Sequence, residues 1–223
     1  MTNYEVAVEI LDNMAYTMPQ MRDFLSERSR GTALTAINAF TDNEYNWEGR
    51  IPEDLCVDCG MTKMVFSCPE WDYVIKIPFI CDTALGAEVD YCEVEAMNYE
   101  LAKEFGLAHH FASCERLPAY HFHSVDYDGD SVVIDIPLYM MEFAEVDVEC
   151  TEDLYSDCYI CDSDDFSDDQ KDAARIFGNY YTDSEVEDLV SFINDNGIND
   201  IHGFNIGYIN GIPVLIDYSG YME

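Results

Sequence analysis

The sequence predicts an α+β fold, and three patterns support that prediction. Over residues 1–50, apolar side chains recur at the three- and four-residue spacing of helix faces. From residue 55, the pattern changes to short apolar runs bounded by turn residues, which is typical of strands. Between such runs, Asp128-Gly129 and Asn210-Gly211 predict tight hairpin turns, so these strands are expected to pair antiparallel.

The first 50 residues are expected to form a helical extension. No chemically active pattern is visible there, so packing or binding of a partner is the expected role. The apolar positions that mark the helix faces are Val6, Ile10 and Leu11, then Met21, Phe24 and Leu25, then Leu34, Ile37 and Phe40.

The middle of the chain predicts strands on both sides of one helix. The expected elements are strands at residues 55–57, 63–67 and 73–79, a helix at 90–105 closed by Gly106, and strands at 120–127 and 131–142. The last two strands form the hairpin that turns at Asp128-Gly129. The predicted order is therefore three strands, one helix and two strands.

The last third of the chain begins with its most acidic stretch. Residues 145–172 show little periodicity and are expected to form a long surface loop or insertion. A capping box of Ser184 and Glu187 then predicts a helix over residues 184–196, with Gly197 just after its end. Two short strands are expected to close the chain as a hairpin, at residues 206–209 and 214–216.

The charge of the chain limits its partners. Its 223 residues include 46 Asp and Glu against 10 Lys and Arg, which gives a net charge of −36. Direct binding to nucleic acid or to an anionic membrane is not expected, because both need clustered basic residues. Hydrophobic residues make up 48% of the chain, which is enough for a packed core. A small molecule, a metal ion or a basic protein surface is the expected kind of partner.

The N-terminus and the nine cysteines indicate a reducing compartment. The first residues include Glu5, Glu9 and Asp12 and no basic segment, so a secretory signal is not expected. Nor does any stretch reach the roughly 18 apolar residues of a transmembrane helix. We therefore expect free thiols in a cytoplasmic protein.

A lysine within an apolar run is the first candidate for chemistry. Lys76 lies in the run Tyr73-Val-Ile-Lys-Ile-Pro78, and burying an ammonium group without a partner costs several kcal/mol. Glu95 or Glu93, on the following helix, is able to neutralise it, and Glu95 borders the expected inward face of that helix. The alternative is a lysine on an edge strand whose ammonium group reaches solvent.

The strongest pattern is a set of polar residues around the last hairpin. Asp200 and Asn205 are five residues apart in a glycine-containing loop, and Asp217 directly follows the last apolar strand. Carboxylate and amide oxygens in such an arrangement suit Mg²⁺ that bridges nucleotide phosphates. The alternative is a pair of polar turns that flank an ordinary hairpin.

In these motifs the sequence resembles the protein-kinase-like superfamily, over about residues 55–220. The matching residues are the loop Asp200-x-His202-x-x-Asn205, the motif Asp217-Tyr-Ser-Gly220 and Lys76 in Val-Ile-Lys-Ile-Pro. The likeness is greater to short phage kinase-like proteins and to small-molecule kinases of the aminoglycoside and choline type than to animal protein kinases.

The resemblance implies a role for each matching residue in the binding of ATP and Mg²⁺. Asp200 would be the catalytic base. Lys76 would contact the phosphates and pair with Glu95, and Asn205 and Asp217 would hold Mg²⁺. The residues implied to surround the nucleotide are Gly60, Thr62, Lys63 and Val65 at the phosphates, and Glu142 and Ala144 of a hinge at 140–144 beside the adenine.

The implied fold is a complete antiparallel-sheet upper lobe with a truncated lower lobe. The expected parts are the helical extension at 1–50, the upper lobe and hinge at 51–144, and the lower lobe at 145–223, which includes the acidic insertion. The sequence departs from the family pattern in three places. Ile198 stands where a histidine is usual, and the expected phosphate loop has one glycine, Gly60, instead of three. The chain also stops early, at Glu223. The shortened pattern indicates a phage or another compact genome, and for a phage protein the host cytoplasm.

Two functions of different classes follow from these residues. The first is ATP- and Mg²⁺-dependent transfer of phosphate to a hydroxyl group of a protein or a small molecule. The second is a non-catalytic, pseudokinase-like acidic protein that imitates nucleic acid and inhibits a basic, nucleic-acid-binding partner, as an anti-defence protein would.

Cysteines and histidines offer further candidate sites. Cys56 with Cys59 and Cys158 with Cys161 form two C-x-x-C pairs, which is a ligand set of structural zinc. The first pair falls on an expected strand that puts its thiols on opposite faces, so separate thiols are the favoured interpretation. His109-His110 has no ligand spacing and is expected at the surface or partly buried.

Overall fold

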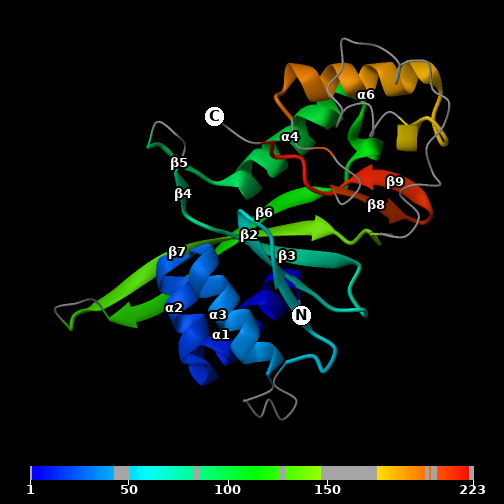
Figure 1. Ribbon diagram of the computed structural model, residues 1–223. Helices are drawn as coiled ribbons and strands as arrows, with labels where there is room; N and C mark the ends of the chain where they lie inside the picture. The colour runs from blue at the N-terminus through cyan, green and yellow to red at the C-terminus, as the bar shows by residue number, and fades with distance from the viewer. Residues whose placement is uncertain are drawn as a thin grey trace. The chain divides into compact units, whose positions relative to one another are not determined.

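The computed structural model describes residues 2–42, 51–82, 86–125, 129–146, 175–198, 201 and 205–220. The chain divides into two compact units, the first formed by Met1–Glu93 and Glu115–Met141, the second by Val94–Cys114 and Glu142–Glu223. The structure contains helices, a five-stranded antiparallel sheet and two two-stranded pairs, which confirms the expected α+β class (Figure 1). No helix in the described ranges combines the length and the apolar character that crossing a bilayer requires.

Three helices begin the first unit. They are α1 (Asn3–Thr17), α2 (Pro19–Glu27) and α3 (Arg30–Thr41). In the capping boxes at Thr2 and Ser29, the cap side chain accepts a hydrogen bond from the backbone N–H of the third residue of α1 and of α3. Helix α2 instead begins with Pro19, whose missing N–H would have had no partner inside the helix.

Helix α3 is buried through alanines. Ala33, Ala36 and Ala39 face the core, whereas Leu34 is 42% exposed. The expected buried face of Leu34, Ile37 and Phe40 is therefore wrong at Leu34, and the other two are only partly buried. The reason is that the small side chains occupy the same helical spacing one position earlier and let the helix backbone approach its neighbours.

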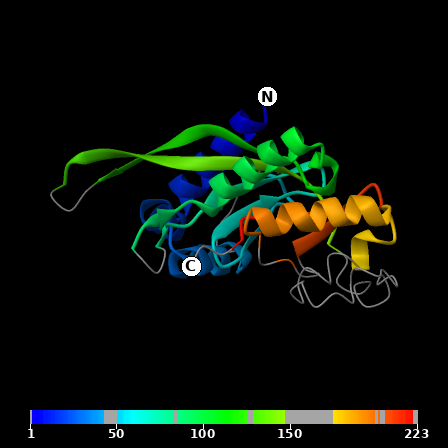
Figure 2. The same cartoon turned by 90° about the horizontal axis from the view of Figure 1, so that it is seen from above.

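The sheet of the first unit has the strand order β1-β2-β3-β7-β6 (Figure 1). Its strands are β1 (Cys56–Cys59), β2 (Lys63–Ser67), β3 (Tyr73–Pro78), β6 (Cys114–Val125) and β7 (Ser131–Glu142). Two short strands, β4 (Cys81–Asp82) and β5 (Glu88–Val89), form a separate pair. Figure 2 shows that β6 and β7 continue as a two-stranded arm, and Gly129 at its tip has a φ of 88°.

The core of the first unit lies between helices α1–α3 and one face of the sheet. Met64, Phe66, Ile75 and Ile77 of β2 and β3 point to this face, and none of them is more than 2% exposed. Because these residues and the apolar residues of the three helices belong to one cluster, the first 42 residues complete the core of the sheet.

Two tyrosines tie helix α1 to strand β6. The hydroxyl of Tyr4 donates a hydrogen bond to the carbonyl oxygen of Ala119, at 3.1 Å. The hydroxyl of Tyr120 donates to a carboxylate oxygen of Asp12, at 2.8 Å. Burial and this carboxylate raise the pKa of Tyr120 well above its ordinary value, so its hydroxyl stays protonated as the donor.

The second unit contains most of helix α4 (Tyr91–Phe105), helix α6 (Asp183–Asp195) and a hairpin of β8 (Ile206–Ile209) and β9 (Ile212–Leu215). Helices α4 and α6 lie side by side in both views (Figures 1 and 2). Asn210 and Gly211 have φ values of 53° and 79°, which confirms the expected hairpin turn. The acidic stretch at 145–172 lies outside the described residues except for residues 145 and 146.

The capping box of α6 differs from the expected one. Thr182 is the N-cap, and its partner is Glu185. The prediction of Ser184 and Glu187 is therefore wrong, because the two overlapping Ser/Thr-x-x-Glu patterns compete and the earlier one caps the helix. Gly197 follows the helix with a φ of 65°, as predicted.

Candidate functional site

Two lysines are buried on the face of the sheet opposite the helices. The register pairs Val65 of β2 with Lys76 of β3, and Lys63 shares their face because alternate residues of a strand point the same way. Lys63 is 4% exposed and Lys76 is 5% exposed. The structure thus brings together three of the residues expected at the nucleotide phosphates, within the first unit.

The turn that joins β1 to β2 contains the other two of these residues. The nitrogen of Gly60 donates a hydrogen bond to the carbonyl oxygen of Lys63, at 3.1 Å, and the carbonyl oxygen of Thr62 accepts from Phe79, at 2.8 Å. A Cβ atom at Gly60 would have no other atom within 4 Å. Packing therefore does not require a glycine here, and the space beside the backbone is open.

Of the two glutamates considered as partners of Lys76, Glu93 contacts other residues of the first unit. It accepts hydrogen bonds from the hydroxyl of Tyr139, at 2.6 Å, and from Arg116, at 2.9 Å. The same hydroxyl lies 2.8 Å from a carboxylate oxygen of Asp90, whose other oxygen accepts from the first backbone N–H groups of α4. Burial and the two carboxylates raise the pKa of Tyr139.

Glu95 occupies a different environment, in the second unit. It is fully buried on α4, the setting in which a carboxylate needs a cation or several donors. The pKa of Tyr218 is raised first by burial, then by the thiol of Cys114 and then by the charge of Glu95. Lys76 and Glu95 belong to different units, so their pairing stays a prediction.

The base of the β8–β9 hairpin brings Asn205 and Asp217 to the same end. Ile206 pairs with Leu215, and the nitrogen of Ile216 donates to the carbonyl oxygen of Asn205, at 2.9 Å. Asn205 is 8% exposed, and Asp217 is half-buried. Asp200 and His202, the other members of the expected constellation, lie outside the described residues.

A set of hydrogen bonds anchors the segment that follows Asp217. The side-chain amide of Asn98 donates to the carbonyl oxygen of Tyr218, at 2.8 Å, and the hydroxyl of Tyr218 donates to the carbonyl oxygen of Ala112, at 2.7 Å. The nitrogen of Ala112 in turn donates to Leu215, at 2.9 Å. Sequence reasoning missed Asn98, although it lies three residues after Glu95 and so on the same side of α4.

The segment expected as the hinge runs beside β8. The nitrogen of Glu142 donates to the carbonyl oxygen of Ser113, at 2.9 Å, so it is already used within the second unit. Glu145 and Tyr208 exchange two backbone hydrogen bonds, at 3.0 and 2.8 Å. Ala144, the residue before Glu145, lies against Gly207. A Cβ atom added to Gly207 would be 2.7 Å from the Cβ of Ala144. Gly207 is therefore needed for the close approach of the two segments.

Possible metal ligands are divided between described and undescribed residues. In the described ranges, no group of three or more His, Cys, Asp or Glu is arranged to hold a metal ion. Asn205 and Asp217 nevertheless supply the hard oxygens that Mg²⁺ prefers. Of the proposed zinc ligands, Cys56 and Cys59 lie on β1, and burial and Asp58 raise the pKa of Cys59, which disfavours its thiolate. Cys158 and Cys161 lie outside the described residues.

His110 is fully buried, which departs from the expected surface or partly buried histidine. Its ring packs against Tyr181 and Phe177, with ring centroids 4.4 and 5.8 Å apart. Among the described residues neither ring nitrogen has a hydrogen-bond partner. Burial, and then the neighbouring His109, lower the pKa of His110 from 6.5 to about 4, so the ring is neutral at pH 7.

The comparisons with known proteins add no family to this geometry. No protein-family profile matches the sequence, and no curated protein is significantly similar to it.

The contact of Gly207 with Ala144 yields a test of the hinge packing. We expect Gly207→Ala to lower the free energy of unfolding by about 1–3 kcal/mol, because the new methyl group overlaps that of Ala144. Ala144→Gly in the same chain should restore most of the loss, and urea unfolding of the four proteins of this double-mutant cycle measures it. Additive losses would show that the two residues are not in contact.

The buried His110 predicts a loss of stability in mild acid. Since its pKa is about 4 when folded and about 6.5 when unfolded, the unfolded chain binds the proton first as the pH falls between these values. The wild type should therefore lose about 2–3 kcal/mol relative to His110→Phe between pH 7 and pH 4. Urea unfolding of both proteins across this range measures this difference in the free energy of unfolding. The many carboxylates titrate in both proteins, so their contribution cancels in the difference. A difference that stays constant with pH would contradict the assignment.

Proposed function

We propose that the protein has a protein-kinase-like fold, binds ATP with Mg²⁺ and transfers the terminal phosphate to a hydroxyl group of a protein or small molecule. The observation that carries the proposal is the burial of Lys63 and Lys76 on one face of β2 and β3. A lysine on the third strand of the sheet and a buried glutamate on the following helix are the pattern of the protein-kinase phosphate site.

The two lysines are the electrostatic argument for an anionic ligand. A chain with a net charge of −36 repels a nucleotide over most of its surface. Lys63 and Lys76 are two of only four lysines in the sequence, and both are withdrawn from solvent on the same face. Concentrated positive charge at a shielded position gives a phosphate chain a favourable place to bind.

Asn205 and Asp217 are the proposed Mg²⁺ ligands. Their side chains belong to the two ends of one hairpin, and the hydrogen bonds of Tyr218 fix the segment that carries Asp217. When bound, Mg²⁺ would neutralise the phosphate oxygens as negative charge shifts toward the leaving group. Phe143 and Ala144 have no backbone hydrogen bond in the described structure, which leaves their amides for the adenine edge.

The proposed reaction places Asp200 as the base. The acceptor hydroxyl oxygen forms a bond to the terminal phosphorus while the bond from that phosphorus to the bridging oxygen breaks. Asp200 accepts the hydroxyl proton, and ADP leaves with the bridging electron pair. Lys76, paired with Glu95 as the resemblance implies, would position the α- and β-phosphates, so that the protein contributes alignment and charge rather than covalent chemistry.

The second proposed function is binding of a basic protein partner without catalysis. The acidic excess favours it, since 46 acidic residues far exceed what the phosphate site uses. An acidic surface steers basic proteins toward it and competes with nucleic acid for their binding grooves. This function needs neither Asp200 nor the lysine pair, so it is tested separately from nucleotide binding.

A thermal-shift measurement tests nucleotide binding. Millimolar ATP with Mg²⁺ should raise the melting temperature, because a ligand that binds only the folded state stabilises it. Asp217→Asn should abolish the magnesium-dependent part of the shift, and Lys76→Met should abolish the whole shift. Asp23→Asn, on the exposed side of α2, is the matched control and should keep the wild-type shift. The absence of any shift in the wild type would rule out the proposed nucleotide binding and with it the phosphate transfer.

A further inference from the structure

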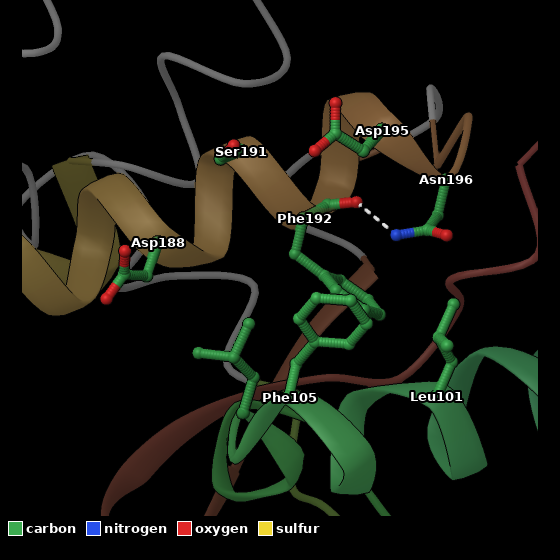
Figure 3. A pocket seen from close by; sticks show the side chains of 8 residues that line it. Leu101, Phe105, Asp188, Ser191, Phe192, Asp195 and Asn196 are labelled. Atoms are coloured by element: carbon green, nitrogen blue, oxygen red, sulfur yellow. Dashed lines mark hydrogen bonds between the residues drawn. The ribbon is translucent and has the colours of Figure 1, made fainter.

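A groove between helices α4 and α6 is a feature of the second unit that the nucleotide site does not use. It has a volume of about 430 Å³ (Figure 3). The residues that line it are Leu101, Phe105 and Leu107 at the end of α4 and after it, and Asp188, Ser191, Phe192, Asp195 and Asn196 along the second half of α6 and just after it. The groove therefore has both an apolar and an acidic component.

The apolar component is centred on Phe105. Its side chain is 67% exposed, whereas Phe192 beneath it is 4% exposed. The two rings meet edge to face with centroids 5.9 Å apart, and Figure 3 shows Leu101 beside them. An aromatic ring exposed to this degree, on the wall of a groove in such a charged protein, is typical of a binding surface.

The acidic component is a row of carboxylates along α6. Asp188 and Asp195 are both exposed and lie seven residues apart, which is two helical turns or about 10.5 Å. Ser191 lies between them on the same side of the helix. Among the described residues that line the groove, none is a lysine or arginine. Two cationic side chains with the same two-turn spacing would therefore match the row.

We propose that this groove binds a basic amphipathic helix of a partner protein. The leucine or phenylalanine stripe of the helix would cover Phe105 and Phe192, and two arginines or lysines seven residues apart would pair with Asp188 and Asp195. A helix laid in an apolar groove with charged flanks is a common mode of peptide recognition. The proposal rests on the second proposed function, for which it names the surface and the class of partner.

The test uses a fluorescent synthetic peptide without ATP. The peptide is an amphipathic helix with one leucine stripe and two arginines seven residues apart. A peptide of the same composition, with its leucines distributed around the helix, is the control. Fluorescence anisotropy at low and at physiological salt should give saturable binding of the amphipathic peptide only, weakened by salt because the pairs with Asp188 and Asp195 are exposed.

Variants of the protein locate the binding. Phe105→Ser and the double variant Asp188→Asn/Asp195→Asn should each weaken binding about tenfold, since each removes one component of the groove. Phe105 is exposed, so its variant should keep the fold, which circular dichroism checks. The double variant Glu9→Gln/Asp23→Asn removes the same charge from exposed positions of α1 and α2 and should change the affinity less than about twofold.

Three results would overturn the proposal. Equal weakening by both double variants would show that the peptide responds only to net charge. Unchanged binding by Phe105→Ser would show that the groove is not occupied. In both cases the second proposed function would still stand, because a basic peptide binds. Absence of peptide binding at low salt would reject both the groove and that function.

Discussion

The burial of positive charge in a strongly acidic protein is the constraint on which this structure depends. Lys63 and Lys76 lose almost all their contact with water on one face of β2 and β3. Removing an ammonium group from water is costly unless anions replace the lost hydration. The opposite face of the same strands is occupied by Met64, Phe66, Ile75 and Ile77. The helices α1–α3 cover that apolar face and so hold the strands in the register that places both lysines together.

The acidic residues serve separate purposes. Some cap helices, such as Asp90 at α4 and Glu185 at α6. Others are withdrawn from solvent, and among these Glu95 is fully buried. Exposed carboxylates such as Asp188 and Asp195 form a surface that favours cationic partners. A net charge of −36 is therefore compatible with an anionic ligand, provided that the ligand binds where the lysines are concentrated.

The sequence patterns predicted the elements well where one physical signal dominated. The strand at 63–67 matches β2, and the Asn210-Gly211 turn needs positive φ values that few other pairs adopt as easily. Helix faces were harder, because the alanine face of α3 competes with the larger side chain of Leu34 in the same spacing. The predicted N-cap of α6 was wrong because two capping patterns overlap there as well, one beginning at Thr182 and one at Ser184.

The candidate site was predictable in its local parts. Alternation along the strands explains the shared face of Lys63, Val65 and Lys76, and the hairpin explains the closeness of the Asn205 and Asp217 backbones. Long-range contacts had no local signal, as the hydrogen bond from Asn98 to Tyr218 shows, because its partners are 120 positions apart in the sequence. The burial of His110 was also missed, since no neighbouring residue predicts the edge-to-face packing of Tyr181 against its ring.

Covalent labelling with an acyl phosphate of ATP tests the central claim, that the buried lysines form the phosphate site. This reagent transfers its acyl group to an amine that lies beside the bound terminal phosphate, and ATP is released. Mass spectrometry should find the label on Lys76 or Lys63, and excess ATP with Mg²⁺ should prevent it. Lys103, which is 46% exposed, reports non-specific labelling. Labelling of Lys103 alone, or labelling of Lys76 and Lys63 that ATP does not reduce, would contradict the account.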